Sequence, residues 1–178
     1  MQKVILDSSA IARSIGRIVH QILEANEGAD NIAIVGIQTR GVDIGKRIVA
    51  KISEMEKKEP PFGTVDITLY RDDFRELVEV PEAKDSKIDF DIKGIDIILV
   101  DDVLYTGRTV RSAIDVILDY GRPKSIQLAV LVDRGGRELP ISANYVGKRV
   151  EVRPDEYVQV YTDETDKEDK VLLIKRKQ

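Results

Sequence analysis

Short runs of β-branched and other apolar residues are the feature that most constrains the fold of this chain. They predict strands at 32–37 (IAIVGI), 65–69 (VDITL), 95–100 (IDIILV) and 126–132 (IQLAVLV). Near-continuous apolar runs suit strands that are buried on both faces of a parallel sheet. Helical patterns fall between most of the runs, which predicts one α/β domain, residues 1–178, with a doubly wound, mainly parallel sheet of about five strands and flanking helices.

Two further segments have patterns of their own. Tyr157, Gln159 and Tyr161 alternate with valines, and a polar stretch, TDETDKED, separates this alternation from VLLI. The pattern predicts a C-terminal β-hairpin with a polar turn. Residues 71–94 are charged and lack a clear period, which is typical of a mobile lid or binding loop.

The composition of the chain restricts the chemistry and the binding partners that are possible. The chain has no cysteine and one histidine, so disulfides and thiolate chemistry are excluded and a metal site would need oxygen ligands. A formal net charge of −4 means that nucleic acid could bind only to a local basic patch. Because no signal peptide and no membrane-spanning run are evident, we expect a cytoplasmic protein that does not bind membranes.

Acidic residues and then a small, hydroxyl-rich loop follow the third predicted strand. Asp101 and Asp102 come first, then a loop ending in TGRT, 106–109, and then a helical pattern. Backbone N–H groups of this loop and the helix N-terminus make a cradle for one phosphate. The aspartates are acceptors suited to a pair of sugar hydroxyls. Phosphate and diol together indicate a ribose 5-phosphate, although aspartates at a strand end could instead cap the helix.

The string IILVDDVLYTGRT resembles the phosphoribosyl diphosphate signature of type I phosphoribosyltransferases. The resemblance implies that fold, with a flexible loop and a hood, and ribose hydroxyls bound by Asp101 and Asp102. Arg40 would neutralise the diphosphate leaving group, with a cis peptide bond beside it, and Arg71 would meet the diphosphate from the flexible loop. Mg²⁺ would arrive with phosphoribosyl diphosphate (PRPP), without direct ligation by the protein.

The resemblance assigns roles to particular residues. The catalytic set is Arg40, Arg71, Asp101 and Asp102. The substrate-binding set comes from three loops and comprises Thr39, Arg40, Gly41, Asp101, Asp102, Val103, Leu104, Tyr105, Thr106, Gly107, Arg108, Thr109, Val132, Asp133 and Arg134.

Further strings along the chain indicate which nucleobase is the substrate. The strings VILD, GIQTRG, ITLYRDD, ILVDDVLYTGRTVR, GRPKSIQLAVLVDRGGRELPI and YVGK are similar to the PyrR family of pyrimidine operon regulators. That resemblance implies conversion of uracil and PRPP into UMP and diphosphate, together with UMP-regulated binding of the operon's messenger RNA leader, which attenuates transcription. It also implies a homodimer or a higher homo-oligomer.

The base would be read by the hood and by Tyr105. Purine-specific relatives usually carry an acidic residue where this chain has Tyr105. A carboxylate left unpaired by a pyrimidine would cost ~1–3 kcal/mol, so the phenol favours a pyrimidine. Val132, Asp133 and Arg134 would form the hood and read uracil largely through backbone groups.

The predicted RNA surface begins on the first helix. Arg13, Arg17 and His20 share one face of it, and the resemblance adds Arg137 and Lys148. Without that resemblance, a basic helical face is more typical of a solvated surface.

Gly16, Gly136 and Ser142 depart from the family, whose members commonly have threonine, histidine and arginine at these positions. These departures weaken the expected RNA surface. Two alternatives to the bifunctional protein also stay open. One is a salvage phosphoribosyltransferase for another nucleobase that does not bind RNA. The other is a nucleotide-gated RNA-binding regulator with vestigial catalysis.

Overall fold

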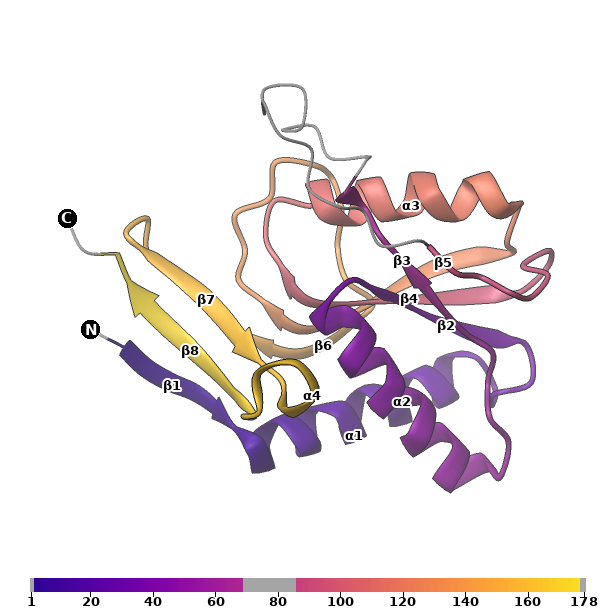
Figure 1. Cartoon of the computed structure of the whole chain (residues 1–178), viewed down its shortest axis with the longest axis horizontal. Coiled ribbons are helices and arrows are strands. Elements are labelled where there is room, and N and C mark those ends of the chain that lie inside the picture. The colour runs from indigo at the N-terminus through magenta and orange to yellow at the C-terminus, as the bar shows by residue number, and fades with distance from the viewer. Residues whose placement is uncertain (1, 69–85, 177–178) are drawn as a thin grey trace.

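A computed structural model of the chain describes residues 2–68 and 86–176 (Figure 1). The described residues form two β-sheets and the helices that cover one of them. In chain order the elements are β1 Gln2–Asp7, α1 Ser8–Ala25, β2 Ile32–Ile37, α2 Arg40–Glu56, β3 Phe62–Val65, β4 Asp96–Leu104, α3 Arg108–Tyr120, β5 Ser125–Asp133, β6 Tyr145–Arg149, β7 Glu156–Tyr161, α4 Asp163–Asp166 and β8 Lys170–Lys175.

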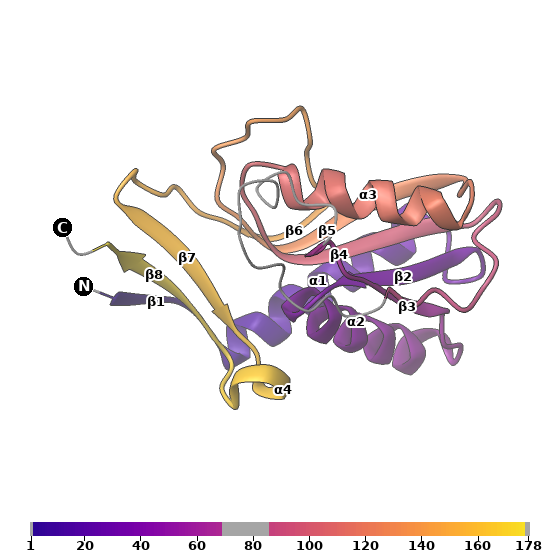
Figure 2. The ribbon, with the colours of Figure 1, turned by 45° about the horizontal axis from the view of Figure 1, so that its top comes forward.

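The larger sheet is parallel throughout and has the strand order β3-β2-β4-β5-β6. Helices α1 and α2 cover one face and α3 covers the other, as Figure 2 shows. Every residue of β2 is buried, which explains its uninterrupted apolar run. The predicted five-stranded, doubly wound α/β sheet is confirmed.

Local sequence signals set the boundaries of the helices that pack on this sheet. The side chain of Asp7 caps α1 by accepting the backbone N–H of Ala10 at 2.8 Å. Isoleucines at helical spacing then face the core, among them Ile11, Ile15, Ile18 and Ile22. Helix α2 ends at Glu56, ahead of Pro60 and Pro61.

The strand predicted at 65–69 is wrong in position, because β3 occupies Phe62–Val65. Pairing with β2 begins directly after the prolines, where the carbonyl of Pro61 accepts the N–H of Ile34 at 2.9 Å. It ends at Val65 because the Asp66 carboxylate accepts the N–H of Thr68 at 2.8 Å, which turns the chain out of the ladder.

The smaller sheet is antiparallel, with the order β1-β8-β7. Strands β7 and β8 form the predicted C-terminal hairpin, and the short helix α4 lies at its turn. The sequence did not predict that β1 would join them. Figure 1 shows this sheet standing beside the larger one, with the two chain ends close together at its outer end.

Candidate active site

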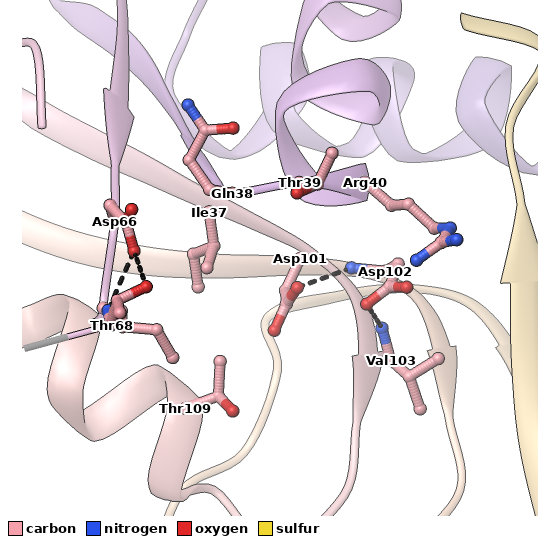
Figure 3. A pocket seen from close by; sticks show the side chains of 11 residues that line it. Ile37, Gln38, Thr39, Arg40, Asp66, Thr68, Asp101, Asp102, Val103 and Thr109 are labelled. Atoms are coloured by element: carbon pink, nitrogen blue, oxygen red, sulfur yellow. Dashed lines mark hydrogen bonds between the residues drawn. The ribbon is translucent and has the colours of Figure 1, made fainter. Parts of the chain in front are cut away.

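The carboxyl ends of β2, β3 and β4 meet at one edge of the parallel sheet and surround a pocket (Figure 3). Its volume is about 400 Å³. Polar side chains dominate the lining, which consists of Ile37, Gln38, Thr39, Arg40, Asp66, Ile67, Thr68, Asp101, Asp102, Val103 and Thr109.

A second cavity, of about 100 Å³, adjoins the first beneath the loop that follows β4. It shares Asp101, Val103 and Thr109 with the larger pocket, and its remaining lining is Leu104, Tyr105, Thr106, Gly107 and Val110. The loop ends at Gly107, whose φ of 93° opens the backbone so that the N-terminus of α3 faces this space. Unpaired N–H groups at a helix start bind anions, and the volume suits a single phosphate.

Asp101 lines both cavities, and its neighbour Asp102 lines the larger one. The Asp101 side chain is buried and accepts the N–H of Asp102 at 2.9 Å, while the Asp102 carboxylate accepts the N–H of Val103 at 2.7 Å. Burial raises the pKa of both carboxyl groups, and the charge of Asp102 raises the pKa of Asp101 further. Hydroxyl groups or cations that bound these two carboxylates would favour their charged forms and so lower their pKa.

Glycines allow the loop after β2 to approach these aspartates. A Cβ atom at Gly41 would lie 2.6 Å from the carbonyl oxygen of Val100, and one at Gly36 would lie 2.6 Å from the Cα of Val42. The start of α2 therefore packs directly on β2 and β4. The peptide bond between Gln38 and Thr39 is cis, as expected beside Arg40.

Arg40 reaches from this loop toward the aspartates, and in Figure 3 its guanidinium lies beside Asp102. Its Nε and Nη2 atoms donate to the Asp166 carboxylate of α4, at 3.0 Å and 2.7 Å. This ion pair raises the pKa of Arg40 and lowers that of Asp166. No sequence pattern predicted this partner of Arg40.

The sequence prediction also missed Asp66 and Thr68, which line the larger pocket opposite Asp101. Both positions fall inside the strand that the sequence predicts at 65–69. An aspartate side chain often accepts the backbone N–H two residues further on, and this turn tendency of Asp66 could have indicated that the strand ends there. Arg71, predicted to contact diphosphate, lies outside the described residues.

The predicted hood residues do not line either cavity. Val132 is buried in β5, and Asp133 accepts a hydrogen bond from Nη2 of Arg137 at 2.6 Å. The Arg134 guanidinium stacks on the ring of Tyr105, 4.0 Å from its centroid. The hood therefore contacts the phosphate loop at Tyr105, which also lines the smaller cavity.

The predicted RNA-binding residues are divided between two places. Arg13, Arg17 and His20 are exposed on α1, and Arg17 donates to the carbonyl of Gly147 at 2.8 Å, next to Lys148. Arg137 instead braces the hood, because its guanidinium also donates to the carbonyls of Tyr105 and Ile141, each at 2.9 Å.

Neither a membrane-spanning helix nor a metal cage is found in the part of the chain that the structure describes. No described helix is long and apolar enough to cross a bilayer. No group of three or more His, Cys, Asp or Glu side chains among residues 2–68 and 86–176 is placed to hold a metal ion. Asp101 and Asp102 could still accept hydrogen bonds from a substrate or from water on a cation that the substrate carries.

A sugar that carries a phosphate at one end and a diphosphate at the other could contact both cavities and the aspartates that line them. Ligands of that kind define the phosphoribosyltransferase class. The family model of the phosphoribosyl transferase domain matches residues 1–164.

Solved hypoxanthine phosphoribosyltransferases share the fold at low sequence identity. The enzyme from Staphylococcus aureus is 21% identical with a TM-score of 0.70, and the match covers 98% of this chain and 92% of that chain. The enzyme from Trypanosoma cruzi is 17% identical with a TM-score of 0.72, and the coverage is 98% and 97%.

Curated proteins named "Bifunctional protein PyrR" are much more similar. The protein of Deinococcus radiodurans is 53% identical over 169 residues, which are 95% of this chain and 92% of that protein. The protein of Thermus thermophilus is 51% identical over 172 residues, which are 97% and 95% of the two chains. This chain belongs to the PyrR family of phosphoribosyltransferases.

Proposed function

We propose that the chain transfers phosphoribose from PRPP to uracil, giving UMP and diphosphate, and that it also binds pyrimidine operon messenger RNA under the control of UMP. One observation carries the enzymatic part: a phosphate-sized cavity and a larger polar pocket adjoin at Asp101, and Asp102 lines the larger pocket. The membership in the PyrR family carries the regulatory part.

The two cavities differ in size and lining, which determines how PRPP would be oriented in the site. The 5-phosphate would occupy the cavity at the start of α3, and the ribose hydroxyls would lie over Asp101 and Asp102. The diphosphate would then extend into the larger pocket, toward Thr39, Arg40 and the close-packed backbone at Gly41. Mg²⁺, bound with the diphosphate, would supply positive charge to the leaving group.

Orientation and charge account for the catalysis that the residues can provide. Phosphoribosyl transfer develops positive charge on the sugar and negative charge on the departing diphosphate, so no protein nucleophile is required. Arg40 is placed to stabilise the leaving group, and Asp101 and Asp102 would fix the sugar against the base. Arg71 would contribute from outside the described residues.

The base would lie near Tyr105, on which Arg134 stacks. A phenol ring at this position offers a flat apolar surface and demands no ring nitrogen from its partner. Backbone groups of Val132, Asp133 and Arg134 could read the carbonyls and N–H of uracil once the hood closes over the base.

RNA would bind across α1 and the end of β6. The hydrogen bond from Arg17 to Gly147 joins these elements, and Lys148 donates to the carbonyl of Ile5 at 3.3 Å. Arg13 and His20 continue the same exposed face along α1. In a homodimer, which we also propose, a twofold axis would repeat this surface.

Two assays on the same preparation test the proposal. The first measures formation of UMP from uracil and PRPP, with hypoxanthine as the competing base. The second measures filter binding of a pyrimidine operon leader RNA at fixed salt, with and without UMP. We expect conversion of uracil, and RNA binding that UMP tightens.

Separate variants keep the two activities distinct. Asp102→Asn should abolish transfer and leave UMP-free RNA binding intact, whereas Arg13→Gln should weaken RNA binding and leave transfer intact. Conversion of hypoxanthine in preference to uracil would support a salvage enzyme for another base. RNA binding without any transfer would support a regulator with vestigial catalysis.

A further inference from the structure

The turn of the C-terminal hairpin is fastened to α2 by a set of polar contacts. Asp43 of α2 is buried, and its Oδ2 atom accepts the hydroxyls of Thr162 and Thr165, each at 2.6 Å. Arg47, one turn further along, pairs with Glu164 and with Asp169. Because these α2 residues share one helix face, the turn is held against that face at several points.

Arg40, the first residue of α2, lies on the same helix face and also reaches the active site. Asp166 takes two of its five N–H donors, at Nε and Nη2, and leaves the others directed away from the ion pair. The Asp166 carboxylate also accepts the backbone N–H of Thr162 at 2.9 Å. The side chains of Arg40 and Asp166 are only 28% and 15% exposed, so the pair is sheltered from water.

The same arginine lines the larger pocket beside Asp102. A free arginine at this position would have many side-chain conformations to lose when it bound an anion. A bidentate carboxylate fixes both the position and the plane of the guanidinium. Two constraints therefore meet on Arg40, one from the hairpin turn and one from the pocket.

We propose that Asp166 is a positioning residue that holds Arg40 in the orientation that binds diphosphate. This assignment rests on the proposed function, because it concerns the diphosphate of PRPP. Asp166 lies beyond residues 1–164, the part that the family model of the phosphoribosyl transferase domain matches. The smaller sheet thereby contributes to a site that the larger sheet builds.

The test compares two ligands of one site in the variant Asp166→Asn. UMP would occupy the phosphate cavity and the aspartates without reaching Arg40, whereas Mg-diphosphate would reach Arg40. Calorimetry should show diphosphate binding weakened about tenfold, because a charge-assisted bidentate pair is lost, and UMP binding changed less than about twofold. The Michaelis constant for PRPP should rise in the same proportion as the dissociation constant for diphosphate.

The control variant is Glu164→Gln. It removes one carboxylate partner of Arg47 from the same turn, and Arg47 retains Asp169. It should leave the affinities for both ligands unchanged. Substitution of Asp166 by glutamate, which keeps the charge on a longer side chain, should recover part of the diphosphate affinity.

Five results would overturn the assignment. Equal loss of UMP and diphosphate binding would mean general damage to the site, and equal loss in Glu164→Gln would mean that only hairpin docking matters. Unchanged diphosphate binding in Asp166→Asn would mean that Asp166 does not position Arg40, and tighter binding would mean that Asp166 competes with the ligand. A wild-type chain that bound neither ligand would overturn the proposed function, and the role of Asp166 with it.

Discussion

Adjacent glycines in the hood allow the contact between the hood and Tyr105 to be measured. Gly135 and Gly136 both have positive φ, 68° and 76°, so an alanine at either position strains the backbone by about 1–2 kcal/mol. A Cβ at Gly135 would meet nothing within 4 Å, whereas one at Gly136 would lie 2.6 Å from Cε2 of Tyr105. The two substitutions therefore differ chiefly in what they do to that ring.

Gly136→Ala should force the ring of Tyr105 away from the Arg134 guanidinium, which now lies 4.0 Å from its centroid. Loss of a partly exposed cation–π contact costs about 0.5–1 kcal/mol. The free energy of unfolding should therefore fall by about 0.5–1 kcal/mol more in Gly136→Ala than in Gly135→Ala. The Michaelis constant for uracil should rise only in Gly136→Ala.

Equilibrium unfolding in urea measures the difference, provided that the dependence of free energy on urea is the same in both variants. Equal unfolding midpoints and equal Michaelis constants would refute the idea that Gly136 is required by the stacked Tyr105. The result also bears on the histidine that PyrR proteins commonly carry at this position. In this hood, histidine would have to displace Tyr105 before it could contact RNA.

Three further predictions follow from the described residues. Gly16→Thr should be accommodated without a clash, because a Cβ there meets nothing within 4 Å. It restores the threonine that the family resemblance leads us to expect, so leader RNA binding should strengthen severalfold in filter assays at fixed salt; unchanged affinity would exclude a role for this position. Gly41→Ala should lower kcat/KM by about 100-fold while circular dichroism stays unchanged, because its Cβ would displace the loop of Arg40 from β4; retained activity would contradict this. Burial raises the pKa of Asp101 and Asp102, so their carboxyl groups lose their protons above the usual aspartate range. Calorimetric affinity for Mg-PRPP should therefore rise with pH through that interval, whereas the contribution of the two groups to the stability of the free protein is present at low pH and is lost across it. An affinity that is flat across this range in wild type, or that keeps the same rise in Asp102→Asn, would refute the assignment.

The sequence predicted those parts of the fold that depend on neighbouring residues. Strand β4, the loop that follows it and α3 are contiguous in the chain, so their apolar runs, glycine and hydroxyls report directly on local structure. Strand β3 was misplaced because the alternation in VDITL fits a strand. Only the side chain of Asp66, which turns the chain at Thr68, ends the ladder earlier.

Contacts between residues far apart in the chain could not be predicted from the sequence. Arg40 and Asp166 are 126 positions apart, and no periodicity along the chain specifies which charges will meet. The same holds for Arg134 and Tyr105, which come together only when β5 is laid beside β4. The sequence therefore indicated the aspartates and the phosphate loop of the site and missed the residue that restrains its arginine.

The pairing of β1 with β8 has a consequence for how the chain is made. Register places Gln2 opposite Ile174 and Asp7 opposite Lys170, so β1 is synthesised well before β8, the strand with which it pairs. The edge of β1 must remain unpaired until β8 has been made, although the larger parallel sheet can begin to assemble earlier. The smaller sheet can therefore be completed only after β8 has been synthesised, and a chain that stops short of β8 would expose an open strand edge to chaperones and proteases.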